Sequence, residues 1–210
     1  LYGGMLNMSG REHLRLRRIV SSAFTPRVLD KIEQDIRTRA ARIVDGLAGR
    51  AEGDFLADVA AVLPVEVICD MLGVPAEDRA EMQRLTVLTL GFGDPAVGTI
   101  DDSLKAAHAL IECGSELGRR RRSDPRDDLV TSLVQARVEG DALTDQEVGS
   151  FFQLLVTAGI ETTGTAIAHG MLQLSRSPDQ RDRWHSDFDS LAPTAVEEIV
   201  RVATPVVSFR

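Results

Sequence analysis

Residues 151–164 have the sequence FFQLLVTAGIETTG, a continuous apolar run that is broken by one polar cluster. The helix that contains this run has a clear beginning, because Thr144 is followed three residues later by Glu147, the pattern of a capping box. No proline follows before Pro178. The sequence therefore predicts one helix over about 145–176, which at about 1.5 Å per residue is roughly 50 Å long and crosses a whole domain. We expect other helices to bury it on nearly all sides.

The polar break in this helix is the first candidate site. Ala158 and Gly159 have little or no side chain, so a large flat group could approach the backbone there. Glu161 and Thr162 follow directly, and a carboxylate and a hydroxyl inside an apolar helix are costly unless they are paired or used. Two interpretations remain open. The pair belongs to a functional site, or Thr162 bonds back to the carbonyl of Ala158 while Glu161 faces a surface groove.

Composition limits the class of protein. The chain has 210 residues, of which 43% are hydrophobic and 27% are charged, so we expect a globular protein with one large domain or two small ones. The formal net charge of -8 argues against nucleic acid as the main partner. We find no apolar run of the length of a membrane span and no secretion signal, and we therefore expect a cytoplasmic protein.

Cysteine and histidine residues give no metal-binding pattern. Cys69 and Cys113 lie far apart and outside any C-x-x-C motif, and the four histidines show no ligand spacing. The sequence predicts neither a metal site nor a disulfide framework in this chain, and we interpret each cysteine as a small buried residue.

The rest of the chain is predicted to be mainly α, with very little strand. Ser9 and Glu12 form a second capping-box pattern, and glycine and proline residues separate the apolar runs. The other predicted helices cover about 10–24, 26–45, 59–72, 76–90, 99–122, 125–137, 178–186 and 193–204. The strand candidates are 54–57 and 206–210. The arginine run 119–122 is interpreted as a solvated helix end.

Two further pairs of polar residues have helical spacing. His13 and Arg17 are one turn apart, so an imidazole and a guanidinium could meet a carboxylate-bearing ligand, although a basic helix in water explains them as well. Glu198 and Arg201 form an i, i+3 pair, which alone is an ordinary helix ion pair.

Together, in this order and at these separations, residues 13–17, 158–163 and 198–201 resemble the cytochrome P450 family. The first segment is similar to the family's C helix, the second to the oxygen-binding groove of its I helix, and the third to its K-helix signature. The resemblance runs over essentially the whole chain. It is greatest to the actinobacterial enzymes that hydroxylate methyl-branched lipids and sterol side chains. The fold implied is a partial P450 fold around a long central I helix.

The resemblance also implies roles for the candidate residues. His13 and Arg17 would bind the propionates of haem b, and Ala158 and Gly159 would lie beside the haem. Glu161 and Thr162 would be catalytic, delivering protons to dioxygen.

Outside this cofactor site, Glu198 and Arg201 would have a structural role. The implied reaction is hydroxylation of an apolar substrate with O2. Its electrons would come from a ferredoxin-type donor, and Arg11, Arg15 and Arg18 are the expected docking residues for it. No nucleic acid is implied.

One expected feature of the family is absent from the sequence. Neither Cys69 nor Cys113 lies in the family's haem-thiolate loop, so 1–210 is interpreted as the central part of one P450 domain without its amino-terminal sheet region and its thiolate loop. As such a fragment it is not expected to be active. Two alternatives stay open: a non-catalytic helical remnant or interaction module, and a different porphyrin binder that uses His13 and Arg17.

Overall fold

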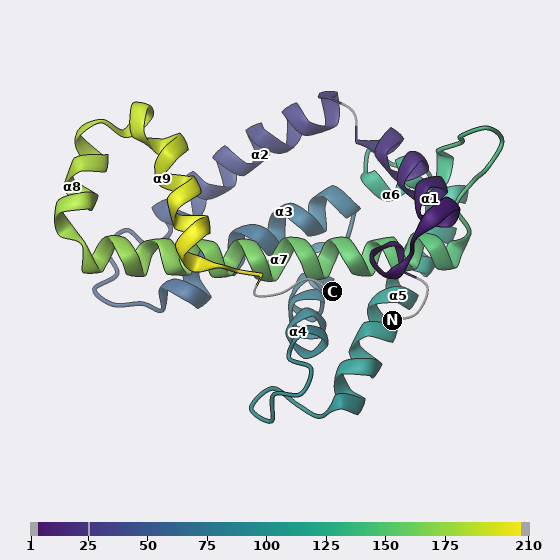
Figure 1. The fold of residues 1–210 in the computed structure, drawn as a ribbon, viewed down its shortest axis with the longest axis horizontal. Helices are drawn as coiled ribbons and strands as arrows, with labels where there is room; N and C mark the ends of the chain where they lie inside the picture. Colours follow the sequence, from purple (N-terminus) through teal and green to yellow (C-terminus); the bar gives the residue numbers. More distant parts are fainter. Residues whose placement is uncertain (1–3, 25, 207–210) are drawn as a thin grey trace.

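The computed structural model describes residues 4–24 and 26–206, and this part of the chain contains helices and no strand. The mainly α fold class is therefore confirmed (Figure 1). The helices are α1 (Gly10–Ala23), α2 (Pro26–Asp45), α3 (Val62–Leu72), α4 (Arg79–Leu90), α5 (Ile100–Ser123), α6 (Leu129–Gln135), α7 (Asp145–Arg176), α8 (Pro178–Ser186) and α9 (Phe188–Ala203). Short helical turns cover Met5–Asn7, Leu56–Ala60 and Ala76–Asp78.

The predicted long helix is confirmed as α7, which runs across the whole molecule (Figure 1). Both hydrogen bonds of its capping box are formed. The Thr144 backbone N–H donates to Glu147 Oε2 at 2.8 Å, and the Glu147 backbone N–H donates to Thr144 Oγ1 at 3.2 Å. Two of the donors that a helix start leaves unpaired are thereby satisfied, which fixes where α7 begins.

Helix α5 crosses the first half of α7 at backbone contact. A Cβ added at Gly114 would overlap the Phe152 side chain and lie 3.0 Å from the Gly149 Cα. A Cβ added at Gly149 would overlap the Ile111 carbonyl oxygen. Glycine is therefore required on both helices, because a side chain on either would push the two backbones apart.

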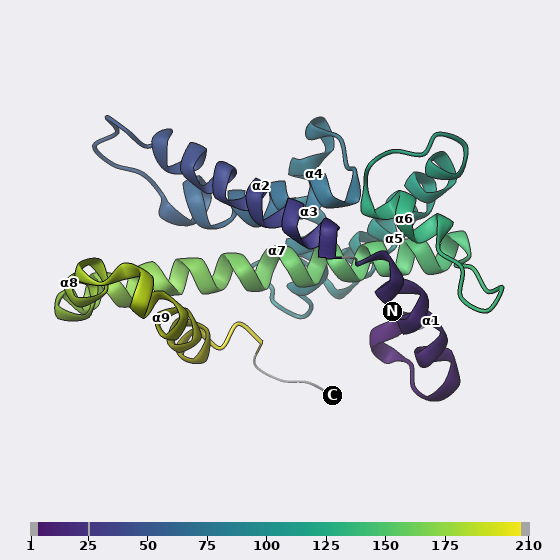
Figure 2. The ribbon, with the colours of Figure 1, turned by 90° about the horizontal axis from the view of Figure 1, so that it is seen from above.

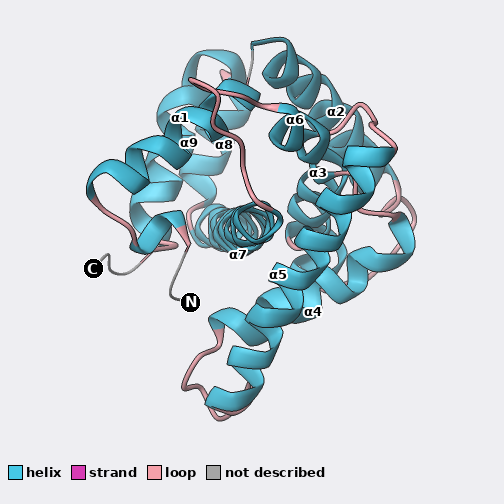
Figure 3. Ribbon diagram, turned by 90° about the vertical axis from the view of Figure 1, so that its right-hand side faces the viewer, coloured by secondary structure: helices cyan, strands magenta, loops and turns pink. Residues whose placement is uncertain are grey.

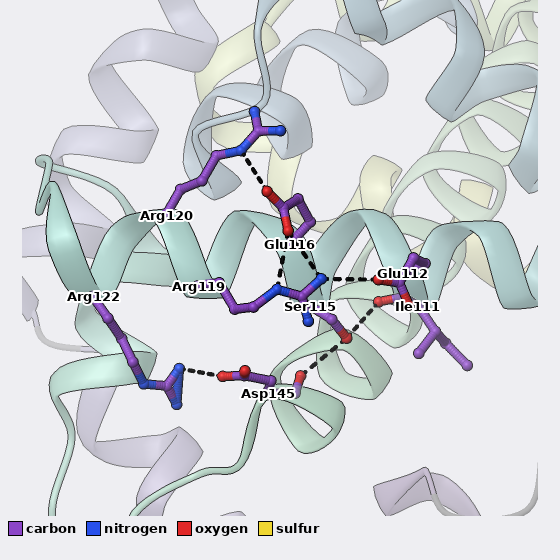
Figure 4. Close-up of polar contacts among 8 residues, drawn as sticks. All are labelled: Ile111, Glu112, Ser115, Glu116, Arg119, Arg120, Arg122 and Asp145. Atoms are coloured by element: carbon purple, nitrogen blue, oxygen red, sulfur yellow. Dashed lines mark hydrogen bonds and ion pairs between the residues drawn. The ribbon is translucent and has the colours of Figure 1, made fainter.

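Polar contacts lock the same crossing near the start of α7 (Figure 4). Ser115 Oγ donates to the Asp145 carbonyl oxygen at 3.1 Å. Arg122 donates to Asp145 Oδ1 at 2.5 Å and to the Leu143 carbonyl oxygen at 2.8 Å. The end of α5 and the start of α7 are thus held by side chains as well as by packing.

The other helices surround α7 unevenly. Seen along its axis, α3, α4 and α5 lie on one side of α7, whereas α1, α8 and α9 lie on the other (Figure 3). Residues of the first half, such as Phe152 and Val156, are fully buried. The expectation of burial on nearly all sides is wrong for the second half, where the exposed residues are Glu161, Thr163, His169, Met171, Leu172, Ser175 and Arg176.

The arginine run at the end of α5 is only partly solvated. Arg121 is 5% exposed and forms an ion pair with Asp128, and it donates to the Gly73 carbonyl oxygen at 3.0 Å. Asp128 also caps α6, accepting from the Thr131 backbone N–H at 2.7 Å. The prediction of a solvated helix end is therefore wrong for Arg121, which joins α3, α5 and α6.

Other differences from the sequence-based predictions concern helix starts. Ser9 precedes α1 without a side-chain cap bond. The strand predicted over 54–57 is wrong, because Asp54 Oδ1 accepts from the backbone N–H groups of Leu56 and Ala57 and starts a helical turn there. In the second strand candidate, Val206 is not in a strand and 207–210 lie outside the described residues.

The last helix begins at Phe188, before the predicted start at Pro193. The rings of Trp184 and Phe188 stack with centroids 5.4 Å apart across the α8–α9 junction. This contact starts α9 early and leaves Pro193 inside the helix, where the missing N–H costs one backbone hydrogen bond.

Candidate functional site

The polar break in α7 is partly accessible, because Ala158 and Glu161 are exposed although Gly159 packs against α3. Thr162 is half-buried, and its Oγ1 donates to the Ala158 carbonyl oxygen at 2.6 Å, so the predicted back-bond is present. The lone pairs of Oγ1 remain available as acceptors. Glu161 is exposed beside it. A hydroxyl and a carboxylate therefore occupy consecutive positions on an accessible part of the helix.

The two small residues of this segment have different surroundings. Ala158 is exposed, whereas a Cβ added at Gly159 would lie 2.5 Å from Ile68 Cδ1 on α3. Gly159 is thus explained by the close approach of α3. Its predicted place beside a cofactor stays a prediction.

An apolar groove runs from Thr162 along α7 to α9. It has a volume of about 550 Å³, and its lining is almost entirely apolar. The side chains that line it include Thr162, Thr163, Ala166, Ile167, Val196 and Ile199. The hydroxyl of the polar break therefore lies at the edge of a surface that suits an apolar molecule.

His13 and Arg17 lie on α1, whose buried side consists of Leu16, Ile19 and Val20. His13 is half-buried and Arg17 is exposed, and the structure shows no ion pair between either of them and another described residue. Helices α1 and α9 extend to the same side of α7, toward opposite ends of it (Figure 2). The structure thus places the motif on α1, His13 and Arg17, on the same side of α7 as the motif on α9, Glu198 and Arg201. The two motifs do not touch each other.

Arg15 differs from Arg11 and Arg18, the other two residues that are predicted to dock the electron donor. It forms an ion pair with Glu147 of α7 and a longer one with Glu12 at 3.3 Å. Burial alone would lower the pKa of the Arg15 guanidinium, but the hydrogen bonds and charges of Glu147 and Glu12 together outweigh burial and raise that pKa. Arg11 and Arg18 are exposed. Arg15 is therefore less available than Arg11 and Arg18 to an electron donor, and its docking role stays a prediction.

Glu198 and Arg201 form a two-pronged ion pair on α9, with both N–O distances at 2.7 Å. The side chain of Arg201 is 70% exposed and that of Glu198 is 60% exposed. The hydrogen bond from Arg201 lowers the pKa of the Glu198 carboxyl. The pair is present as predicted, and its structural role stays a prediction.

The cysteines are in different environments. Cys69 is fully buried, and burial raises the pKa of its thiol to about 12, so it is protonated at neutral pH. Cys113 is exposed on α5, contrary to the prediction of a buried residue. Within the described residues there is no cluster of three side chains that could hold a metal ion, and no helix there is long and apolar enough to cross a membrane.

Known proteins resemble this chain in sequence. The chain is 47% identical, over 100% of its length, to the methyl-branched lipid omega-hydroxylase of Mycobacterium tuberculosis strain H37Rv, and it covers 50% of that protein. It is 38% identical, over 98% of its length, to the steroid C26-monooxygenase of the same strain, of which it covers 47%. The chain thus spans about half the length of the curated relatives it matches. No protein-family model matches it.

Solved structures resemble it in fold. A cytochrome P450 of Mycobacterium marinum in complex with pseudoionone matches 94% of this chain with a TM-score of 0.86 and 37% identity, over 49% of its own chain. A Bacillus subtilis cytochrome P450 of the bacillaene polyketide synthase matches 98% with a TM-score of 0.87 and 31% identity, over 52% of its own chain. This chain has the fold of about half of a cytochrome P450.

Relationship to P450 enzymes implies haem, and the described residues fit this group. Haem has two carboxylates and an apolar ring. The free side chains of His13 and Arg17 suit carboxylates, since a guanidinium and an imidazole both donate hydrogen bonds to them. Exposed Ala158, with only a methyl side chain, leaves room for a ring beside α7.

The surroundings of Gly159 lead to a prediction about this P450 segment. We expect Gly159→Ala to lower the stability of the full-length protein by about 1 kcal/mol, because the new methyl group meets Ile68. Adding Ile68→Val removes the nearest methyl group and should restore part of this loss. Urea denaturation of the two single variants and the double variant measures both effects. Loss of haem affinity with unchanged stability of the apo protein would contradict the packing role.

Proposed function

We propose that the protein to which this chain belongs is a haem-dependent monooxygenase. It hydroxylates an apolar substrate, a lipid or sterol side chain, with O2 and electrons from a ferredoxin-type donor. The observation that carries this proposal is the apolar groove of about 550 Å³ with Thr162 at its edge. The names of the relatives, a lipid hydroxylase and a steroid monooxygenase, support the substrate class.

The cofactor is proposed to be haem b. His13 and Arg17 would hold its carboxylates, and Ala158 would leave room for its ring on the open side of α7. Bound haem supplies the redox chemistry that activates dioxygen.

The residues of this chain then handle substrate and protons. The groove between α7 and α9 binds the apolar part of the substrate and excludes water from it. Thr162 Oγ1 donates to the Ala158 carbonyl oxygen, and its lone pairs can accept a hydrogen bond. When the hydroxyl rotates away from that carbonyl, Oγ1 can give its proton to dioxygen on the open side of α7 and take a replacement proton from a water molecule. Exposed Glu161 takes protons from solvent and supplies them to this hydroxyl.

The first test of this function is a carbon monoxide difference spectrum of the reduced full-length protein after haem reconstitution. We expect a Soret band at about 450 nm, the signature of thiolate-bound haem. The isolated 1–210 chain is the control, since both of its cysteines lie outside the groove. Absence of any haem signal from the full-length protein would contradict the function and favour a helical scaffold without the chemistry.

The role of Thr162 is tested by Thr162→Ala. We expect this variant to bind substrate normally but to release mainly hydrogen peroxide, because protons are no longer delivered at the correct position. Ser175→Ala is a matched control, since Ser175 lies on the same helix and makes the same type of back-bond, to the Met171 carbonyl oxygen at 2.8 Å. Product and peroxide are measured per NADH consumed. Tightly coupled turnover by Thr162→Ala would contradict the proposed role of Thr162 in proton delivery.

The docking surface for the electron donor is reduced to Arg11 and Arg18, because Arg15 is paired with Glu147. Replacing both with Gln should raise the KM for an acidic ferredoxin and flatten the salt dependence of the reduction rate. Arg84→Gln, which removes one charge from an exposed pair on α4, is the control. Stopped-flow reduction over a range of ionic strength decides the question, and unchanged salt dependence would place the docking surface elsewhere.

A further inference from the structure

The helix that carries His13 and Arg17 is tied to α7 through its opposite side. Successive residues on a helix are turned by about 100°, so Arg15 points about 160° away from both of them. Its guanidinium pairs with Glu147 in the first turn of α7, although the two residues are 132 positions apart. The side chains are only 27% and 19% exposed, so water screens this pair less than the ion pairs on the surface.

Glu147 uses both oxygens of its carboxylate. Oε2 accepts from the Thr144 backbone N–H at 2.8 Å, and Oε1 accepts from Arg15. One side chain therefore starts α7 and holds α1 at the same time. A glutamine could keep the capping bond, but it has no charge and only one oxygen.

The remaining contacts of α1 are less directional. The helix packs mainly against α6 through apolar side chains, and Phe24 meets Phe151 of α7 edge-on with ring centroids 6.5 Å apart. Apolar packing of this kind allows a helix to rotate or slide more easily than a charged hydrogen bond does. The ion pair thus adds a directional contact to this packing, and it constrains the rotation of α1 relative to α7.

We infer that Arg15 is a positioning residue for the cofactor. By pairing with Glu147 it holds α1 so that the opposite side of this helix, which carries His13 and Arg17, is turned away from the start of α7 and left open for the cofactor. Arg15 itself touches neither the cofactor nor the substrate. This inference rests on the proposed function, because it requires that His13 and Arg17 bind the carboxylates of haem.

The test is a double-variant cycle in the haem-loaded full-length protein. Arg15→Gln and Glu147→Gln should each speed the release of haem to excess apomyoglobin by roughly threefold, and the double variant should release it no faster than either. Arg15→Lys keeps the charge and should restore part of the retention. Arg37→Gln, which breaks an exposed pair with Glu33 on α2, is the matched control.

A second measurement separates positioning from general stability. In the apo protein, Arg15→Gln and Glu147→Gln should increase hydrogen exchange within α1 while α5 and the middle of α7 stay protected. Wild-type protein that retains no haem would contradict the proposed function, and this inference with it. The other contrary outcome is that the wild-type protein retains haem while the Arg15→Gln and Arg37→Gln variants release it equally fast. That outcome would overturn the positioning role of Arg15 and leave the proposed function standing.

Discussion

The close crossing of α5 and α7 is the contact on which the rest of the structure depends. Gly114 and Gly149 let the two backbones touch, and Phe152 fills the space beside them. Because the crossing involves the first half of α7, it fixes that half in the core. The second half extends beyond it, and there α8 turns away from the end of α7 and α9 returns to meet it at a steep angle (Figure 1). One end of α7 is therefore a structural support, and the other end stays accessible within the described residues.

Much of this arrangement could be predicted from the sequence, because local signals determine it. The capping box of Thr144 and Glu147 fixed the start of α7, and the chain has few strand-forming segments. The back-bond from Thr162 to the Ala158 carbonyl oxygen is likewise a local contact between residues four apart. Relationship to the P450 enzymes was visible in three short motifs, each of which lies within a single helix.

Contacts between distant residues could not be predicted in the same way. The second bond of Glu147, to Arg15, has no sequence pattern, since helices far apart in the chain supply its partners. Burial of Arg121 inside a run of arginines depends on where α3 and α6 pack. The predicted start of α9 at Pro193 was wrong because it used only the preference of proline for the first turn of a helix. The stacking of Trp184 on Phe188 involves two helices and has no such local signal.

The buried contact of Arg121, Asp128 and Gly73 has a consequence for how sequences like this one can diverge. A methyl group at position 73 would overlap the carboxylate of Asp128, and that carboxylate holds the guanidinium of Arg121. A change at one of the three positions leaves a buried charge unpaired or a steric overlap. Substitutions at these positions should therefore occur together in viable relatives. Covariation among these three positions would therefore report a buried contact that lies outside all three P450-like motifs.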